Sequence, residues 1–455
     1  MKYDKFLIQA VASVRDTLSK IEENSHGVIF ATNQENTVIG MATDGDIRRY
    51  LLNGGSLEDQ IWQCVNRDFV WETPSVPREL LLKKLDSSIR IIPLLDGNKQ
   101  LVGLVTRNQI PEQDEGAVYA RARSPVRISF GGGGSDLTHY FTGENTGAVI
   151  STTVSLYSHA TLRLRDDSRI VVRSSDLCDE LVADSLESAI SCAGQFGLIQ
   201  SVIKAINPQF GFELFLHSDF PMKSRLGGSA VVAAAILGCF NEFRRDKWDA
   251  YEIAEIAYQA ERHYLEVAGG WQDQYATVFG GFNFMEFRSD QNIIHPLRIQ
   301  QDVRLELEES LILCDTNTTH DSGQIHDDQR RQMGADAVRS LVDANVNLCI
   351  RMRDCLLRGR LSEFGTYLDE AWQLKRQFSE KISSSSLDRI YTDARSNGAL
   401  GGKLLGAGGG GFFIFFVPAF ERYGLISHLE AAGLSVQPFR FDEDGLQSWT
   451  ARESV

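Results

Sequence analysis

Three glycine-rich segments, each joined directly to an apolar stretch, place the strongest constraint on how this chain folds. The first begins with the apolar strand Ser124-Pro-Val-Arg-Ile-Ser-Phe and runs into four glycines at 131–134, followed by Ser135 and Asp136. Backbone without side chains at such a turn can approach a ligand closely. A glycine run also suits any tight turn, so this segment alone does not identify a site.

The other two segments add a helix and a strand to this pattern. Residues 220–230 read Phe-Pro-Met-Lys-Ser-Arg-Leu-Gly-Gly-Ser-Ala and precede an apolar run of good helix formers, with Ser229 at its expected start. The first N–H groups of a helix lack intrahelical partners and carry the positive end of the helix dipole, so they bind anions such as phosphate. Residues 401–416 run through four glycines at 408–411 into an apolar strand.

In this order and spacing the three segments resemble the motifs of the GHMP small-molecule kinases, the superfamily of galactokinase, homoserine kinase and mevalonate kinase. Within it, the Gly-Gly-Gly-Gly-Ser-Asp-Leu opening and the Lys-Leu-Leu-Gly-Ala-Gly-Gly-Gly-Gly-Phe close are similar to those of bacterial D-glycero-D-manno-heptose 7-phosphate kinases. The resemblance implies an α+β fold with two lobes: a ribosomal protein S5 domain 2-like, ATP-binding lobe over residues 120–300 and a C-terminal α/β lobe over 301–455.

The pattern of the residues also indicates mixed helices and strands without regular βαβ alternation. Period-2, β-branched stretches at 151–164 and 212–217 predict half-buried strands. Helices are expected over 249–267, 335–358 and 361–380, and the serines at 383–386 predict another helix start, because a hydroxyl there caps free N–H groups.

The composition limits the partners of the chain. A formal net charge of -15 and a pI near 5.1 argue against binding to nucleic acids or anionic membranes. The seven cysteines are single and scattered, which is typical of reduced cytosolic thiols. The start lacks the apolar stretch of a signal peptide, and no segment approaches the roughly 18 apolar residues of a membrane span. We therefore expect a cytoplasmic protein whose partners are small molecules and other subunits.

Residues 1–115 are expected to form a separate unit with two similar halves, joined to the rest by a polar linker that opens with Pro111. Val38-Ile-Gly-Met-Ala-Thr-Asp-Gly-Asp-Ile in the first half is repeated as Leu101-Val-Gly-Leu-Val-Thr-Arg-Asn-Gln-Ile in the second. This tandem repeat resembles a CBS-domain pair, a module whose strand-to-helix turn often holds adenine nucleotides and which commonly forms homodimers.

By that resemblance, Thr43 and Asp46 match the residues that contact ribose and phosphate, which implies a regulatory nucleotide site. In the second half Thr106 is followed by Gln109 rather than by an acid, so a second nucleotide site is doubtful. A pseudo-symmetric scaffold that binds nothing and only mediates dimerisation is an equally good interpretation.

Phosphoryl transfer needs donors around the phosphates, a metal, and an acid that positions the attacking hydroxyl. By resemblance to the GHMP kinases, Asp273 is the catalytic base, and Glu261 binds Mg²⁺ together with Ser229. Arg127 matches the basic residue of the first motif, which in some members stabilises the catalytic aspartate, and an ordinary strand-edge arginine is the competing interpretation. Outside this context, an aspartate after a Gly-Gly turn is usually a helix cap and a helix glutamate is usually solvated.

The same resemblance assigns the ligand-binding loops. ATP is expected on the second motif, at Lys223, Ser224, Arg225, Leu226, Gly227, Gly228, Ser229 and Ala230. The sugar is expected on the first and third motifs, at Gly133, Gly134, Ser135, Asp136, Gly408 and Gly409. Asp136 matches the position that accepts hydrogen bonds from substrate hydroxyls in sugar kinases, and Lys403 either faces substrate or is an ordinary lysine at a strand end.

Two departures from the family pattern bear on activity. Lys223 and Arg225 stand where many members have glycine, so they either add charge beside the phosphates or block close backbone approach. Residues 313–328 also depart from the common pattern. Four side chains there, His320, Asp321, His326 and Asp327, fit no standard zinc spacing, and a polar loop is the favoured interpretation.

The leading hypothesis is an ATP- and Mg²⁺-dependent sugar kinase acting on the anomeric hydroxyl of a heptose 7-phosphate or similar sugar, on the way to a nucleotide-activated sugar for surface polysaccharide. Two alternatives remain open. One is a nucleotide-binding regulatory or scaffold protein in which Lys223 and Arg225 have ended catalysis. The other is a kinase for a free sugar such as fucose.

Overall fold

The computed structural model describes residues 3–86, 89–106, 117–143, 145–220, 226–318 and 336–453. The chain forms two compact units that divide between residues 116 and 117. All three glycine-rich segments belong to the second unit, so the candidate site is built there. The linker predicted after Pro111 lies outside the described residues.

The N-terminal unit repeats one order of elements. In the first half β1 pairs in parallel with β2 across helix α1, and β3 pairs antiparallel with β2 before helix α2. In the second half Glu72 bridges in parallel to Leu94 of β4, helix α3 lies between them in sequence, and β5 pairs antiparallel with β4. The bounds are η1 Asp4–Phe6, β1 Leu7–Gln9, α1 Val14–Asn24, β2 Val28–Thr32, β3 Val38–Thr43, α2 Asp44–Leu52, η2 Ile61–Gln63, α3 Arg78–Lys84, β4 Ile91–Leu95 and β5 Leu101–Thr106.

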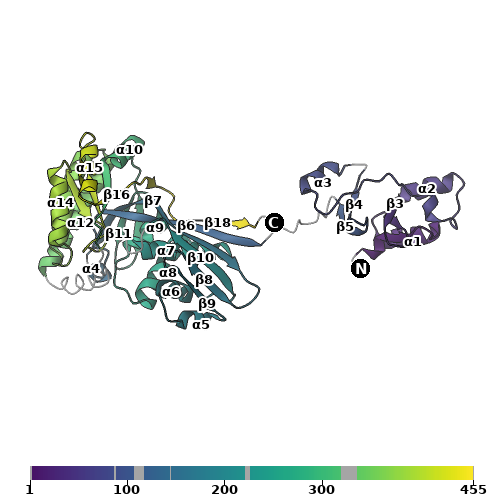
Figure 1. Ribbon diagram of the computed structural model, residues 1–455, viewed down its shortest axis with the longest axis horizontal. Coiled ribbons are helices and arrows are strands. Elements are labelled where there is room, and N and C mark those ends of the chain that lie inside the picture. Colours follow the sequence, from purple (N-terminus) through teal and green to yellow (C-terminus); the bar gives the residue numbers. More distant parts are fainter. Residues whose placement is uncertain are drawn as a thin grey trace. The chain divides into compact units, whose positions relative to one another are not determined.

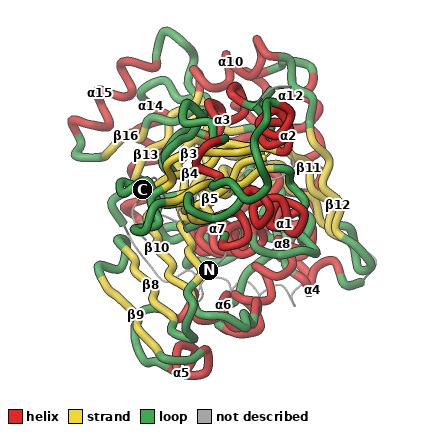
Figure 2. Tube along the Cα trace, turned by 90° about the vertical axis from the view of Figure 1, so that its right-hand side faces the viewer, coloured by secondary structure: helices red, strands yellow, loops and turns green. Residues whose placement is uncertain are grey.

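The second unit is organised around a nine-stranded sheet. Its continuous path runs β12-β11-β7-β10-β8-β9, while β6 pairs with β7 and β18, and β17 pairs with β7. In Figure 2 strands β8, β9 and β10 lie side by side, with helix α5 near the end of β9. The strands are β6 Val118–Gly131, β7 Gly147–Leu164, β8 Ile170–Ser174, β9 Asp179–Ala183, β10 Phe212–Ser218, β11 Asn283–Phe287, β12 Asn292–Pro296, β17 Phe441–Asp442 and β18 Gln447–Arg452.

Helices cover one face of this sheet because one side of each strand is apolar. Leu162 of β7 and Leu214 of β10 are buried in the same core as the alanines of helix α7, and α7 itself is apolar on nearly all sides. Helices α5, α6, α8 and α9 lie on the same side of the unit as α7 (Figure 1). Their bounds are α5 Leu186–Ser191, α6 Gly197–Ile206, α7 Gly228–Glu242, α8 Ala250–Gln259 and α9 Gln272–Phe279, with the short α4 at Thr138–Phe141.

A second, four-stranded sheet with the order β14-β15-β13-β16 carries the third glycine segment. Helices α12, α14 and α15 gather near this sheet in Figure 1. The apolar side chains of α12 and α13 pack between it and strand β6. The bounds are α10 Gln301–Ser310, β13 Leu311–Asp315, α12 Asp336–Leu357, α13 Leu361–Arg376, α14 Ser385–Ser396, β14 Gly401–Leu404, β15 Phe412–Phe416, α15 Arg422–Ala431 and β16 Ser435–Gln437.

The elements expected from the sequence are present. The predicted strands fall inside β7 and β10, and the predicted helices correspond to α12 and α13. Ser384 caps helix α14, since its hydroxyl accepts a hydrogen bond from the Leu387 N–H group. The helix expected over 249–267 is divided, because α8 ends at Gln259 and a π-helical turn follows. The α+β fold class is confirmed.

Candidate active site

Arg127 and Asp273 form an ion pair where strand β6 meets the start of helix α9. Nε and Nη2 of Arg127 each lie 2.7 Å from Oδ1 of Asp273, and the arginine side chain is only 3% exposed. Gly227 adjoins both residues, because a Cβ at that position would lie 3.5 Å from Arg127 Cγ and from Asp273 Oδ2. The structure therefore brings together the predicted base, the predicted arginine and the second glycine segment.

Helix α7 starts at the second glycine segment. Gly227 is the N-cap residue, with φ at +80°, a conformation that glycine adopts without strain. No described side chain caps the helix, and Ser229 lies in the first turn rather than at the cap. Leu226 and Ala230 are buried beside it. The predicted ATP contacts Lys223, Ser224 and Arg225 lie outside the described residues.

Glu261 lies on η3 (Ala260–Tyr264), a π-helical turn that continues helix α8. Such turns insert one residue into a helix and are frequent at functional sites. The Glu261 side chain is 3% exposed. Its Oε1 accepts a hydrogen bond from Ser229 Oγ, and its Oε2 accepts one from Gln274 Nε2. The two residues predicted to bind a metal are therefore in direct contact.

The oxygen atoms at this point fit Mg²⁺, which prefers hard oxygen ligands and keeps several water molecules. A carboxylate and a hydroxyl meet beside the start of α7, where phosphates would bring further oxygens. The buried Oε1 of Gln274, next to this point, has no hydrogen-bond partner within the described residues.

In the first glycine segment, the polar side chains bind neighbouring backbone. Ser135 Oγ donates to the carbonyl of Gly132 and accepts from the N–H group of Ala148. The Asp136 carboxylate is 2% exposed and accepts from the N–H groups of Gly134 at 3.0 Å and Gln272 at 3.3 Å. Asp136 therefore links the first segment to the turn that carries Asp273, and its contact with a substrate hydroxyl stays a prediction.

The backbone of the first segment is also held from helix α12. Asn345 is buried, its Nδ2 donates to the carbonyl of Gly133, and its Oδ1 accepts from the N–H group of Gly132 at 3.4 Å. Gly134 has a φ of +96° and faces Phe378. The loop is thus held by hydrogen bonds from α12 and lies against Phe378 in the chain that follows α13.

The third glycine segment is fixed by helix α13. Lys375 is buried and donates from Nζ to the carbonyls of Leu404 and Gly406. Gly409 donates its N–H to the carbonyl of Ile382 at 2.8 Å, and Gly408 has a φ of +121° against the same isoleucine. The predicted substrate positions Gly408 and Gly409 therefore sit on a rigid turn.

Lys403 connects the third segment to the first. Its Nζ is buried and donates to the carbonyl of Ser129 at 2.8 Å, so this lysine faces strand β6 and not open solvent. Burial, and to a lesser degree the nearby Arg127 guanidinium, lower the pKa of Lys403 to about 7. Burial also raises the pKa of Asp136, with a further contribution from the charge of Asp273.

Three residues of this site were not found from the sequence: Gln274, Asn345 and Lys375. Gln274 directly follows the predicted base, so its place on the first turn of α9 was a usable signal. Asn345 lies in the middle of α12 and Lys375 in the last turn of α13, where a basic residue is common, so nothing in the local pattern separates them from solvated residues. Residues His320, Asp321, His326 and Asp327 lie outside the described residues.

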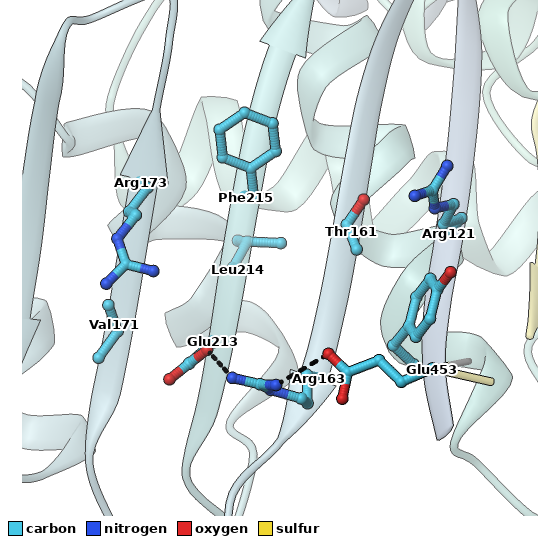
Figure 3. A pocket seen from close by; sticks show the side chains of 10 residues that line it. Arg121, Thr161, Arg163, Val171, Arg173, Glu213, Leu214, Phe215 and Glu453 are labelled. Carbon is cyan, nitrogen blue, oxygen red and sulfur yellow. Dashed lines mark hydrogen bonds and ion pairs between the residues drawn. The ribbon is translucent and has the colours of Figure 1, made fainter. Parts of the chain in front are cut away.

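A shallow groove of about 410 Å³ lies on the solvent face of the large sheet, away from the glycine segments. Figure 3 shows Arg173, Phe215, Thr161 and Arg121 across four neighbouring strands of this groove. Arg163 pairs with Glu213 at 2.6 Å and Glu453 at 3.2 Å, so much of the positive charge is balanced. No glycine segment lines the groove, and it is not the candidate active site.

In the N-terminal unit, Thr43 and Asp46 form a capping box at the start of helix α2. Thr43 Oγ1 accepts from the Asp46 N–H group, and Asp46 Oδ2 accepts from the Thr43 N–H group. Arg49 also pairs with Asp46. These contacts place both residues at the end of β3, and their contact with nucleotide stays a prediction.

Known proteins share this architecture. Two family models match: GHMP kinases N terminal domain over residues 197–281 and GHMP kinases C terminal over 352–432. The D-glycero-alpha-D-manno-heptose 7-phosphate kinase of Campylobacter jejuni is 36% identical over 335 residues, covering 72% of this chain and 98% of that protein. A solved D-glycero-D-manno-heptose 1-phosphate kinase from Bacteroides thetaiotaomicron is 28% identical with a TM-score of 0.60, covering 72% of this chain and 98% of that one.

A more distant relative phosphorylates a free sugar by name. The L-fucokinase/L-fucose-1-P guanylyltransferase of Bacteroides fragilis is 26% identical over 351 residues, which cover 69% of this chain and 36% of that protein. With the glycine loops, the fold and these similarities together, the chain belongs to the GHMP kinase family. It is an ATP-dependent sugar kinase within that family. No helix in the described parts of the chain is long and apolar enough to span a membrane.

Proposed function

We propose that this kinase transfers the γ-phosphate of ATP to the anomeric hydroxyl of D-glycero-D-manno-heptose 7-phosphate or a related sugar phosphate. The observation that carries the proposal is the Arg127–Asp273 pair beside Gly227, in a chain 36% identical to a heptose 7-phosphate kinase. The product, a sugar phosphorylated at the anomeric carbon, suits synthesis of a nucleotide-activated sugar for surface polysaccharide.

Asp273 serves as the base in this proposal. Arg127 occupies Oδ1, while Oδ2 faces Gly227 at the start of α7, where a γ-phosphate would bind. A carboxylate there can orient the sugar hydroxyl in line with the phosphate and accept its proton. Most of the rate enhancement then comes from positioning and electrostatic stabilisation, which requires few catalytic side chains.

The triphosphate lies on the first turn of α7. Residues Leu226, Gly227, Gly228, Ser229 and Ala230 present backbone N–H groups there, and Lys223, Ser224 and Arg225 would extend the contacts toward the phosphates. Ser229 and Glu261 would hold Mg²⁺. When bound, the metal ion neutralises charge on the β- and γ-phosphates.

The sugar lies between the first and third glycine segments. Gly133 and Gly134 on one side, and Gly408 and Gly409 on the other, offer backbone groups on loops fixed by Asn345 and Lys375. Ser135 and Asp136 complete this proposed substrate site. Asp136 would contact a sugar hydroxyl directly, and it also orients the loop by accepting hydrogen bonds from the N–H groups of Gly134 and Gln272.

For the N-terminal unit we propose a CBS-like regulatory module that binds an adenine nucleotide at Thr43 and Asp46 and forms a homodimer in the cytoplasm. Its support is the repeated order of elements, in which Thr43 and Thr106 end equivalent strands and pair with Val28 and Ile91. Nucleotide binding to this unit that leaves turnover unchanged would remove the regulatory part of the proposal.

The test is release of ADP from Mg²⁺-ATP by the purified protein, with heptose 7-phosphate, free heptose, other sugar phosphates and fucose as acceptors. We expect turnover with the heptose phosphate, and loss of turnover by about 10² to 10⁴-fold in Asp273→Asn with ATP binding retained. ATP binding without turnover on any acceptor would refute the proposal and favour a regulatory scaffold.

A kinase for free fucose is the second candidate, favoured by the similarity to the fucokinase of Bacteroides fragilis. The same panel separates the two, because a site selected for a phosphosugar discriminates against an acceptor that lacks the phosphate. Turnover with fucose that exceeds turnover with heptose 7-phosphate would establish this second candidate.

A further inference from the structure

Gln274 is a fully buried amide on the first turn of helix α9, directly after Asp273. Its Nε2 donates a hydrogen bond to Oε2 of Glu261. Its Oε1 has no hydrogen-bond partner in the part of the chain that the structure describes. An amide in this orientation presents its donor to the carboxylate, as the charge of the carboxylate requires.

The two oxygens of Glu261 therefore have different neighbours. Ser229 contacts Oε1, which is the oxygen on the side of helix α7 and the phosphate-binding turn. Gln274 contacts Oε2, and the Arg262 guanidinium is 3.8 Å from Oε1. Because one donor holds each oxygen, the plane of the carboxylate is fixed.

Fixing that plane matters for a metal ligand. Carboxylates that bind metals are generally hydrogen-bonded themselves, and these supporting partners affect metal affinity strongly. A buried Glu261 without Gln274 would keep its charge but lose the donor on Oε2 and could rotate away from Ser229. Glu261 itself lies on the π-helical turn, a local irregularity of a kind that is frequent at functional sites.

We propose that Gln274 is a positioning residue for the metal site: it holds Glu261 so that Oε1 faces Ser229 and the phosphates. This inference rests on the proposed function. It also explains why two adjacent residues of α9 matter together, because Asp273 positions the attacking hydroxyl while Gln274 positions the metal ligand. One short helix therefore sets the distance between base and metal.

The test measures metal binding directly. Electron paramagnetic resonance can give the affinity of Mn²⁺ for the full-length protein saturated with a non-hydrolysable ATP analogue. Gln274→Met keeps the length of the side chain and removes the donor, and Gln274→Asn keeps an amide that is one methylene too short to reach Glu261. We expect Mn²⁺ affinity to fall by about 10 to 100-fold in either folded variant. The Mg²⁺ concentration for half-maximal rate should rise in parallel, with KM for the sugar unchanged at saturating Mg²⁺.

Thr277→Val is the matched control. Thr277 is buried on the same helix, and its hydroxyl contacts Ser124 Oγ and the carbonyl of Pro125, each at 2.6 Å, rather than Glu261. It should lower the melting temperature but leave Mn²⁺ affinity unchanged.

If the wild type is active and a folded Gln274 variant binds Mn²⁺ with unchanged affinity, the inference is overturned while the proposed function stands. An equal loss of affinity in Thr277→Val would also overturn it, because general loosening of α9 would then explain the effect. If the wild-type protein binds ATP but neither Mn²⁺ nor any acceptor sugar, the proposed function fails and the inference fails with it.

Discussion

Arg127 places two donors, Nε and Nη2, on the same oxygen of Asp273, each at 2.7 Å from Oδ1. The second oxygen, Oδ2, is thereby turned toward Gly227 and the start of helix α7. Two donors on one oxygen restrict rotation of the whole carboxylate. The orientation of the proposed base is therefore a property of strand β6 as much as of its own helix.

This relationship predicts that Arg127→Lys lowers kcat by about 10²-fold, a loss typical of small misplacement of a reacting group. Lysine keeps the charge but lacks the planar fork that supplies two donors to one oxygen. The rate should be measured with saturating ATP and sugar, and ATP affinity, determined by calorimetry, should stay close to that of the wild type. A kcat equal to that of the wild type would show that the fork does not orient Asp273.

Gly270 predicts a second, steric effect. A Cβ at this position would overlap the carboxylate of Asp136, which is buried and bound to two backbone N–H groups. We expect Gly270→Ala to destabilise the second unit, residues 117–453, by about 1–3 kcal/mol, the usual cost of overpacking. It should also raise KM for the sugar. Thermal melting and initial rates measure the two effects.

Gly424→Ala is the control for that substitution. Gly424 lies inside helix α15, and apart from its chain neighbours and the backbone of its own helix no atom lies within 4 Å of its Cβ position. Alanine there should be neutral or stabilise by about 0.5–1 kcal/mol because of its higher helix propensity. If both substitutions changed stability equally, the space around Gly270 would not be the cause.

Lys403 predicts a dependence of stability on pH. Its pKa is about 7 in the folded protein and is normally near 10.5, so between these values the unfolded chain binds a proton that the folded chain does not. The free energy of unfolding from this group therefore rises with pH across that window, by up to about 1.4 kcal/mol per pH unit, and is flat below pH 7. Lys403→Met should remove the rise. Melting curves of both proteins from pH 6 to 10 test this, and parallel profiles would contradict it.

Asp46 offers a test of the N-terminal unit. If adenine nucleotide binds at Thr43 and Asp46, then AMP, ADP or ATP should slow amide hydrogen exchange over β3 and α2 in the wild type, and Asp46→Asn should abolish this protection. Thr43→Val should instead destabilise α2 by about 1 kcal/mol with or without nucleotide, because it removes the N-cap hydroxyl. Protection that persists in Asp46→Asn would place the nucleotide elsewhere.

The sequence was most informative about those residues of the candidate site that belong to short local motifs. The glycine segments, Asp273, Glu261 and Ser229 were singled out by their resemblance to the motifs of the GHMP kinases. The structure places Asp273 beside Gly227 and Ser229 in contact with Glu261, while the roles of these residues stay predictions. Asn345 and Lys375 were not found, since each acts on a loop that meets its helix only through packing. Asn345 contacts Gly132 and Gly133, more than 200 positions earlier in the sequence.

The limits on predicting the fold have a similar cause. Period-2 alternation was enough to predict β7 and β10, because it reports which face of a strand is buried. The π-helical turn at Ala260–Tyr264 was missed, since one inserted residue barely changes an apolar pattern of helical period. The contacts of the Asp136 carboxylate with backbone N–H groups could not be predicted either, because an aspartate in a turn can bind backbone or ligand equally well.

Strand β18 forms an edge partner for β6, pairing Gln447 with Arg123 and Arg452 with Val118. During synthesis β6, the first strand of the second unit (the kinase unit), can therefore pair with β18 only after almost all of that unit has been synthesised. At about 5–20 residues per second, this interval lasts tens of seconds, while the N-terminal unit already has all of its described strands. We expect a ribosome-bound chain to carry a folded first unit beside a kinase unit with an unpaired strand edge, which is the stage most exposed to aggregation.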